Sequence, residues 1–431
     1  MNMPFAQHLR SSNNLVEAWF HVRSKARKSP SKDIRDACED FEKKSYARLQ
    51  RIQTALQRKK YKFPLAEGIL KDKRKREAQN KLPRPIVLAD IEARVVQRAL
   101  LQCLQPKPNT KLAKQLKTLN EINKSEVNFG GTPKGGVPKA LQKIMQALND
   151  GCIVYYKSDI AAFFTKVPHQ YVLDFLITET NDQDFTDVFK DGLNVQLKNA
   201  DAIKEYLDLF PDNDIGVPQG SALSAMAGNI FLHEVDNVMK QLSGIRFVRY
   251  IDDVIILAKS NDALQKAKSV FQKELRKRSL TLYDPAKDPD KAAEGHVRNG
   301  FEYLGCLVQK NQLEPGKQTK RRLIEKIIIE IQYAKKHIEA LEKNPKLTRV
   351  REVTFAKCIV NIDELVRGWA NSFRFANDRK PFHQLDAEIK KLIDDFVKWF
   401  ENRKFSTTAQ RLRAFGAFQL IDTEYKKIED Y

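Results

Sequence analysis

Arg246-Phe-Val-Arg-Tyr-Ile-Asp-Asp-Val-Ile-Ile-Leu-Ala258 is the stretch of this chain that decides its fold. Two short apolar runs rich in β-branched residues flank the polar pair Asp252-Asp253, which predicts a hairpin with carboxylates at its tip. Adjacent acids in a tight turn repel each other unless a positive charge lies beside them, and hard carboxylate oxygens suit Mg²⁺. A solvated turn is the alternative, because aspartate is a good turn residue in its own right.

The chain is strongly basic. Its 431 residues include 76 Lys and Arg against 55 Asp and Glu, which gives a formal net charge of +21. Such an excess suits a polyanionic partner, nucleic acid first and an anionic membrane second. No strongly amphipathic basic helix stands out as a membrane anchor, and this favours nucleic acid. A basic surface that serves only solubility is the alternative.

The length and the apolar content predict several cores in a water-soluble protein. Hydrophobic residues make up 42% of the chain, and its length predicts about two to four subdomains. No apolar run approaches the length of a membrane span, and the N-terminus lacks a secretory signal, so a cytoplasmic protein is expected. The five cysteines lie far apart, without a Cys-x-x-Cys pair, which predicts reduced thiols rather than disulfides or zinc ligands.

A third acid stands at the end of a predicted strand, Cys152–Asp159, where its carboxylate could also cap the following helix. Two loops rich in glycine and proline precede predicted helices. Residues 128–138 lead into a helix that closes near Gly151, and residues 215–224 lead into a helix through about Leu242. The first loop could hold phosphate on its backbone N–H groups, but it matches neither the P-loop nor the dinucleotide fingerprint.

Arg84 lies in a short predicted strand entered through prolines. Its guanidinium could clamp phosphate oxygens at two points, and an ordinary surface arginine is the alternative. The remaining expectations, in chain order, are a helical segment over residues 1 to about 60, an exposed flexible loop at Lys71–Arg76, a helix Ile91–Leu104 capped by Asp90, an irregular acidic segment 176–214, a helix from about Ala263 to Arg278, a strand pair within Phe301–Val308 and basic helices from Lys317 onward.

The order of these motifs resembles that of the bacterial reverse transcriptases, in particular those of group II introns, of retrons and of defence systems. The resemblance covers nearly the whole chain. Ser372 departs from it, because the group II intron enzymes often have tyrosine there. The matching segments are Lys81-Leu-Pro-Arg-Pro-Ile86, Ser158-Asp-Ile-Ala-Ala-Phe-Phe164, Gly216-Val-Pro-Gln-Gly-Ser221, Tyr250-Ile-Asp-Asp253, Lys287, Tyr303-Leu-Gly305 and Leu365-Val-Arg-Gly-Trp-Ala-Asn371.

The resemblance implies an α+β fold of the right-hand polymerase type. An N-terminal helical extension would span residues 1–60 and the fingers residues 61–150. The palm, an antiparallel sheet with helices, would span residues 151–310, with 176–214 as an insertion on the fingers side. A helical thumb and C-terminal region would span residues 311–431.

The resemblance also implies a site for two-metal phosphoryl transfer, with two Mg²⁺ ions that Mn²⁺ could replace. Its metal ligands would be Asp159, Ile160, Asp252 and Asp253, with Asp159 and Asp252 bridging. Lys287 would donate a proton to the leaving pyrophosphate. The other implied contacts are Arg84, Lys73 and Arg74 with the triphosphate, Phe164 beneath the sugar, Gln219 and Gly220 beneath the nascent base pair, and Tyr250 with the primer end.

Phe164 has two interpretations. In the family a bulky ring at this position excludes a 2′-hydroxyl and so favours deoxynucleotides. The alternative is that Phe163 or Phe164 is simply part of the core, and one of them must be.

The expected function is an RNA-directed DNA polymerase that extends a primer with dNTPs, acting with a structured non-coding RNA in bacterial antiviral defence. Its partners would be the RNA template, the DNA product and dNTPs, with no membrane. Template-independent or protein-primed DNA synthesis is a first alternative, with Tyr425 or Tyr431 as a priming hydroxyl. An RNA-binding maturase or scaffold is a second, and the intact acids argue against it.

Overall fold

The chain forms two compact units in a computed structural model, Met1–His296 and Val297–Tyr431. The structure describes residues 4–29, 31–78, 82–212, 214–344, 353–417 and 420. Helices are mixed with antiparallel strands in both units, which confirms the predicted α+β class.

The first unit contains a sheet of four strands, a separate pair of strands and many helices. Its elements, in chain order, are α1 (Phe5–Leu9), α2 (Ser12–Ala26), α3 (Lys32–Lys43), α4 (Ser45–Gln57), β1 (Glu67–Lys71), α5 (Lys73–Glu77), β2 (Arg84–Leu88), α6 (Ile91–Leu104), α7 (Lys111–Gln115), α8 (Thr118–Asn123), α9 (Val137–Asn149), β3 (Val154–Asp159), η1 (Phe163–Thr165), α10 (His169–Thr180), α11 (Gln183–Leu193), η2 (Asp201–Leu209), α12 (Ser224–Gln241), β4 (Ile245–Tyr250), β5 (Asp253–Ala258), α13 (Asn261–Arg276) and β6 (Ala292–His296).

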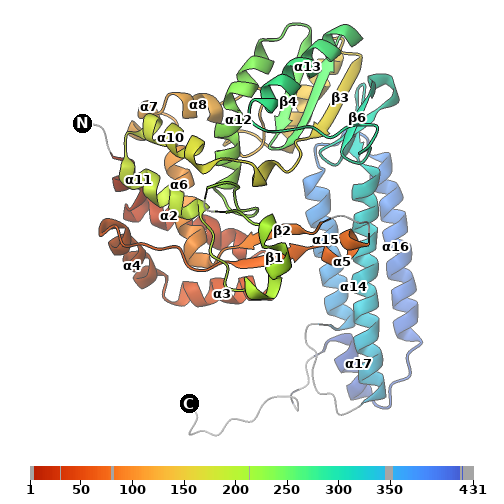
Figure 1. Cartoon of the computed structure of the whole chain (residues 1–431). Helices are drawn as coiled ribbons and strands as arrows, with labels where there is room; N and C mark the ends of the chain where they lie inside the picture. Colours follow the sequence, from red (N-terminus) through yellow and green to blue (C-terminus); the bar gives the residue numbers. More distant parts are fainter. Residues whose placement is uncertain are drawn as a thin grey trace. The chain divides into compact units, whose positions relative to one another are not determined.

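The four-stranded sheet has the order β4-β5-β3-β6, and all its pairs are antiparallel. Helix α13 packs against β3 and β5 (Figure 1). Helix α9 packs against β4. The apolar residues Val254 to Ala258 of β5 are all buried, so both faces of this strand are covered. The β-branched run that predicted the hairpin is therefore the centre of the sheet, and the predicted hairpin is confirmed.

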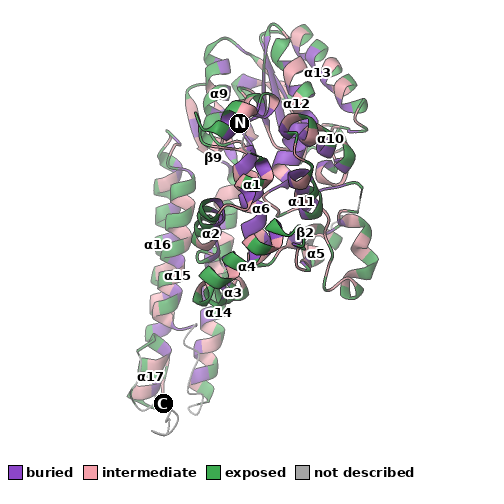
Figure 2. Ribbon diagram, turned by 90° about the vertical axis from the view of Figure 1, so that its left-hand side faces the viewer, coloured by how far each residue is buried: buried purple, intermediate pink, exposed green. Residues whose placement is uncertain are grey.

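The N-terminal helices pack around α6, which is largely buried in Figure 2. The predicted helix Ile91–Leu104 is confirmed, and its first turn is capped as expected. The Asp90 carboxylate accepts a hydrogen bond of 2.8 Å from the Ala93 N–H. The helical character predicted for residues 1 to about 60 is also confirmed across the part that the structure describes.

The prediction of a flexible loop at Lys71–Arg76 is wrong. Lys71 ends β1, where it pairs in register with Arg84 of β2, and Lys73 begins the short helix α5. The Tyr206 hydroxyl donates to Glu77 of that helix, and the Lys73 ammonium lies 4.5 Å from the centre of the Tyr206 ring. These contacts with a distant segment order a charge run that local composition alone assigns to solvent.

The prediction of an irregular segment over residues 176–214 is also wrong. Helix α11 begins at Gln183, after Asp182 accepts a hydrogen bond of 3.0 Å from the Phe185 N–H. Phe185, Phe189 and Leu193 recur every four residues and are fully buried. Acidic residues between these apolar positions conceal the helical period.

The second unit contains a three-stranded antiparallel sheet and a group of long helices. The predicted strand pair is confirmed as β7 and β8, to which β9 adds a third strand, and the helical region begins at Lys317 as predicted. Its elements are η3 (Val297–Asn299), β7 (Phe301–Tyr303), β8 (Cys306–Gln309), β9 (Gln312–Pro315), α14 (Lys317–Lys343), α15 (Phe355–Ser372), α16 (Lys380–Glu401) and α17 (Thr408–Phe415). Helices α14, α15 and α16 share one apolar core (Figures 1 and 2).

The described part of the chain has no helix that is long and apolar enough to span a membrane. All five cysteines are described, and each is a buried free thiol.

Candidate active site

Three carboxylates gather at one end of the four-stranded sheet. In the β3–β5 register Asp159 lies directly opposite Asp253, the first residue of β5. Asp252 occupies the turn between β4 and β5, and its carbonyl oxygen accepts a hydrogen bond of 2.9 Å from the Ile160 N–H. One turn and one strand end thus bring together the four residues that were predicted to be metal ligands.

The carboxyl groups of the turn are partly withdrawn from water. Burial is the main cause that raises the pKa of Asp253, to about 8, and a hydrogen bond with the Asp159 carboxyl and the charges of Asp159 and Asp252 act in the same direction. Burial and the Asp159 charge also raise the pKa of Asp252. Crowded like charges with little access to water are stabilised by a neighbouring positive charge.

Lys291 supplies such a charge, and the sequence interpretation missed it. Its ammonium forms an ion pair with the Asp159 carboxylate. The predicted lysine, Lys287, is exposed on the preceding loop, where its backbone N–H donates to the Asp284 carbonyl at 3.1 Å. Both lysines flank the short run Lys287-Asp-Pro-Asp-Lys291, so the motif by itself could not distinguish them.

The oxygen donors at this end of the sheet suit a metal ion, but they are not arranged as a ready ligand set. Within the described residues, no three His, Cys, Asp or Glu side chains already form a ligand set. The Lys291 ammonium lies at Asp159, where a cation would bind, and Asp253 is hydrogen-bonded to the same carboxyl. Carboxylate oxygens are nevertheless the ligands that Mg²⁺ prefers in proteins.

The turn that carries Asp252 has an unusual backbone. Ile251 adopts φ +62°, a left-handed conformation that is rare for a β-branched residue and costs about 1–3 kcal/mol. Gly130, in the glycine-rich loop, packs against this turn. A Cβ atom at position 130 would lie 2.5 Å from the Ile251 backbone nitrogen, so only glycine permits the approach.

A buried arginine holds the same turn from inside. Arg249 is 1% exposed, and its Nε donates to Asp236 Oδ1 of α12 at 2.8 Å. Its Nη1 donates to Asn229 Oδ1 at 3.1 Å and to the Ile251 carbonyl oxygen at 2.9 Å. Asn229 in turn donates to the Gly130 carbonyl oxygen at 2.9 Å. One charged network therefore ties α12, the glycine-rich loop and the turn together.

The sequence interpretation did not find this network. The available signal was a charged residue inside the otherwise apolar strand Ile245–Tyr250, since a buried charge requires a partner. Its partners, Asn229 and Asp236, lie on the preceding helix, and local sequence does not point to them.

The two phenylalanines after Asp159 have different environments. Phe163 is 2% exposed, and its ring lies against Gly228 of α12, where a Cβ atom would come within 2.7 Å of it. Phe163 is therefore the core residue of the pair. Phe164 is half-buried, its ring centre lies 5.4 Å from that of Phe163, and its carbonyl oxygen accepts a hydrogen bond from the Val217 N–H.

The loop of Gln219 and Gly220 is attached to strand β2. The Val87 N–H donates to the Gln219 carbonyl oxygen at 2.8 Å, and Gly220 has φ +114°. A Cβ atom at position 220 would lie 2.8 Å from the Val87 carbonyl oxygen, so glycine is required there on two grounds. Arg84, at the start of the same strand, is exposed. Its positive charge acts to lower the pKa of Asp252, against the larger effect of burial.

The remaining predicted contacts lie at different places. Tyr250 ends β4 and pairs in register with Asp253, so it adjoins the carboxylates. Lys73, the first residue of α5, is held by Glu77 and by the Tyr206 ring, and Arg74 is exposed next to it. Lys81 lies outside the described residues.

More than half of the chain, residues 70–308, matches the family described as Reverse transcriptase (RNA-dependent DNA polymerase). The chain belongs to the reverse transcriptase family. The matched region includes every predicted site residue, and it confirms the resemblance that the motifs indicated.

Similar proteins include curated sequences and solved structures. Protein YkfC of Escherichia coli is 23% identical over 259 residues, which are 52% of this chain and 62% of that protein. An uncharacterized 91 kDa protein in a cob intron of Schizosaccharomyces pombe is 28% identical over 115 residues, 27% of this chain and 13% of that protein. Apo telomerase from Candida tropicalis aligns with a TM-score of 0.42 and 12% identity, covering 82% of this chain and 63% of that one. This chain thus spans less than two thirds of either curated relative.

The wider family uses divalent metal ions in its reaction. In this chain the end of the sheet with Asp159, Asp252 and Asp253 is where such an ion has suitable oxygen donors.

Proposed function

We propose that this reverse transcriptase chain is an RNA-directed DNA polymerase that extends a primer on an RNA template with dNTPs. One observation carries the proposal: the β3–β5 register sets Asp159 opposite Asp253, with Asp252 in the adjoining turn. The family match supports the same activity. The net charge of +21 suits a nucleic-acid partner.

Asp159, Ile160, Asp252 and Asp253 would hold the two Mg²⁺ ions, with Asp159 and Asp252 as the main ligands. When bound, such ions neutralise charge on the attacking and leaving oxygens of a phosphoryl transfer. The protein contributes the placement of the oxygens, through the strand pair and through the hydrogen bond from Ile160 to Asp252. Lys291 would release Asp159 and become available to the substrate phosphates.

The substrate contacts follow from the same placement. Phe164 would lie beneath the sugar and exclude a 2′-hydroxyl, and Gln219 and Gly220 would form the floor beneath the base pair. Tyr250 would contact the primer end. Arg84, whose charge opposes the rise in the pKa of Asp252, would bind the triphosphate, together with Lys73 and Arg74 of helix α5. Lys287, exposed on its loop, would serve as proton donor to the leaving pyrophosphate.

The biological setting that we propose is a bacterial cytoplasm, where the enzyme would copy a structured non-coding RNA in antiviral defence. This setting rests on the motif resemblance alone. A phage-challenge assay with the wild-type gene and with the Asp252→Ala/Asp253→Ala gene tests it, and equal phage sensitivity of the two strains would refute it.

The decisive experiment for the activity is DNA synthesis by the purified protein with its bound nucleic acid. Labelled dNTPs are supplied with Mg²⁺, with and without an added RNA template and primer, and the product is sequenced. Wild type is expected to yield labelled DNA complementary to the RNA, and Asp252→Ala/Asp253→Ala to yield none. Equal labelling by the double variant would refute the catalytic assignment.

The same assay separates the alternatives. Product that does not depend on template would indicate template-independent synthesis, and label that stays covalently bound to the protein would indicate protein priming. The tyrosines considered for priming, Tyr425 and Tyr431, lie outside the described residues.

A further inference from the structure

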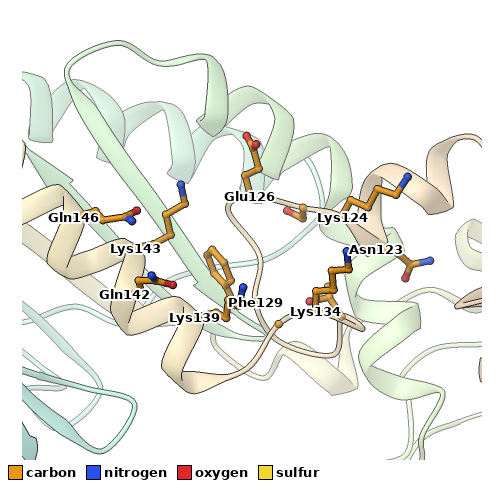
Figure 3. Close-up of a pocket in the computed structure, with 12 residues that line it drawn as sticks. Asn123, Lys124, Glu126, Phe129, Lys134, Lys139, Gln142, Lys143 and Gln146 are labelled. Atoms are coloured by element: carbon orange, nitrogen blue, oxygen red, sulfur yellow. The ribbon is translucent and has the colours of Figure 1, made fainter. Parts of the chain in front are cut away.

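The glycine-rich loop Asn128–Gly136 contacts the catalytic turn and α12 on one side and lines a pocket on the other. On one side Gly130 contacts the Ile251 turn, and Gly131 contacts Ala225 and Asn229 of α12. On the other side Phe129, Thr132 and Gly135 line an open pocket of about 460 Å³, and α9 forms another of its walls. Figure 3 shows that pocket and its side chains. The pocket therefore lies directly behind the loop that supports the proposed catalytic turn.

Four lysines line this pocket, which we call the lysine pocket: Lys124 after α8, Lys134 in the loop, and Lys139 and Lys143 one turn apart on α9. Figure 3 shows them on both walls. Within the described residues, none of the four has a carboxylate at ion-pairing distance. The acid that lines the pocket, Glu126, is paired with Lys240 at 3.1 Å. This pairing is the main cause that lowers the pKa of Glu126, and the charge of Lys143 acts in the same direction.

Four like charges around one cavity, with a single acid that is itself paired elsewhere, are unfavourable unless an anion or solvent compensates them. Lysine ammonium groups are point-charge ligands for phosphate. Four of them around one cavity match a ligand with more than one phosphate group. Ser125, Thr132, Gln142 and Gln146 line the same pocket and offer hydroxyl and amide groups, which can pair with a 2′-hydroxyl.

We infer that the lysine pocket binds the sugar-phosphate backbone of single-stranded RNA. Its volume of about 460 Å³ is in the range of sites for one small molecule, which suits one nucleotide unit of a single strand. Phe129 is only 7% exposed and leaves little ring surface for stacking a base. Recognition is therefore of the backbone and independent of sequence. The inference takes from the proposed function only that RNA is a partner.

Binding in the lysine pocket would act on the catalytic turn through a single loop. The Phe129 N–H donates to the Arg249 carbonyl oxygen at 2.9 Å, and the Gly136 N–H donates to the Phe129 carbonyl oxygen at 2.7 Å. The wall of the pocket is thus hydrogen-bonded to the strand that leads into the turn. RNA held there lies one loop away from the proposed polymerisation site.

The test measures RNA affinity of the full chain by fluorescence anisotropy, without Mg²⁺ or dNTPs, across a salt series. The probe is a labelled unstructured 20-nucleotide RNA, with DNA of matched sequence and free ATP as competitors. The variant is Lys139→Gln/Lys143→Gln. The matched control is Lys111→Gln/Lys114→Gln on α7, which removes the same charge from exposed lysines of the same unit.

The expected result for the pocket variant is roughly tenfold weaker RNA binding and a log–log salt slope reduced by about 1.4, since each single-strand phosphate contact contributes about 0.7. The control variant should change neither quantity appreciably. Equal losses in the two variants would overturn the inference in favour of non-specific surface charge. Displacement of the RNA by equimolar DNA would refute RNA selectivity, and displacement by low-millimolar ATP would indicate a nucleotide site instead.

The outcome is distinguishable from failure of the proposed function. Asp252→Ala/Asp253→Ala should bind the RNA probe as wild type does while making no DNA. If wild type makes no DNA but the pocket variant still loses RNA affinity, the polymerase proposal fails and the pocket inference stands. Since all four lysines are exposed, the melting temperature of the pocket variant should equal that of wild type. This measurement also verifies that the variant is folded.

Discussion

The Arg249 Nη1 atom donates a hydrogen bond of 2.9 Å to the carbonyl oxygen of Ile251, two residues further along the chain. The acceptor residue is the one with φ +62°. Strained conformations persist only where the surroundings over-determine them. A fully buried guanidinium, itself fixed by Asp236, provides that constraint from within the core. The position of Asp252 is therefore set from beneath the turn as well as by the strands.

Removing the charge of Arg249 is expected to cost both stability and activity. Arg249→Met leaves Asp236 buried and unpaired, which should lower the free energy of unfolding by about 3–5 kcal/mol. The double variant Arg249→Met/Asp236→Leu removes both charges and should recover most of that stability. It should not recover DNA synthesis, because the Ile251 carbonyl still lacks its donor. Denaturant unfolding and primer extension together measure this, and full activity in the stable double variant would contradict a positioning role.

Gly130→Ala is expected to displace the turn. The new Cβ atom would lie 2.5 Å from the Ile251 backbone nitrogen, and a backbone atom cannot move aside as a flexible side chain can. A shift of about 1 Å in a catalytic group can cost about a hundredfold in kcat. Steady-state kinetics of primer extension measures the loss.

Gly368→Ala is the matched control for that substitution. Gly368 lies within helix α15, and a Cβ atom there meets nothing within 4 Å. The change should raise the free energy of unfolding by up to about 1 kcal/mol and leave primer extension unchanged. If both variants kept wild-type kinetics, the contact between Gly130 and the turn would have no catalytic consequence.

Lys291 and Lys287 are expected to behave differently when each is replaced by methionine. Lys291→Met removes the ammonium paired with Asp159, so the crowded carboxylates should lower the melting temperature of the metal-free protein. Millimolar Mg²⁺ should restore it, because the ion supplies the missing positive charge. Lys287→Met changes an exposed side chain and should leave the melting temperature unaltered with or without Mg²⁺.

Kinetics then assign the role of each lysine. A fall in kcat with an unchanged melting temperature in Lys287→Met would support the proton-donor role proposed for Lys287. Wild-type kcat in that variant, together with a large loss in Lys291→Met, would transfer the functional role to Lys291.

Phe164→Ala is expected to relax sugar discrimination while leaving the protein folded, because the ring is half-buried. The ratio of NTP to dNTP incorporation should rise, since the ring that would exclude the 2′-hydroxyl is gone. Phe163→Ala, in contrast, empties a core position against Gly228 and should cost about 3–5 kcal/mol of stability. An unchanged NTP to dNTP ratio in Phe164→Ala would show that Phe164 is not the discriminating residue.

The parts of the site that sequence predicted are the local ones. The hairpin, the strand ending in Asp159 and the cap at Asp90 each follow from a pattern within about a dozen residues. The parts that were missed depend on contacts between distant segments. Arg249 finds Asn229 and Asp236 on a neighbouring helix, and the charge run after β1 is ordered by Tyr206. Lys291 was missed because two lysines four residues apart fit one motif.

The antiparallel register of β3 and β5 limits which insertions and deletions this region tolerates. Side chains alternate between the two faces of a strand, so one residue added within β5, after Asp253, would turn every following side chain of the strand to the opposite face. Val254 to Ala258 are all enclosed, and the protein could not absorb that reversal. Variant libraries of this region should therefore substitute residues at constant length, and insertions or deletions belong in the loops between elements.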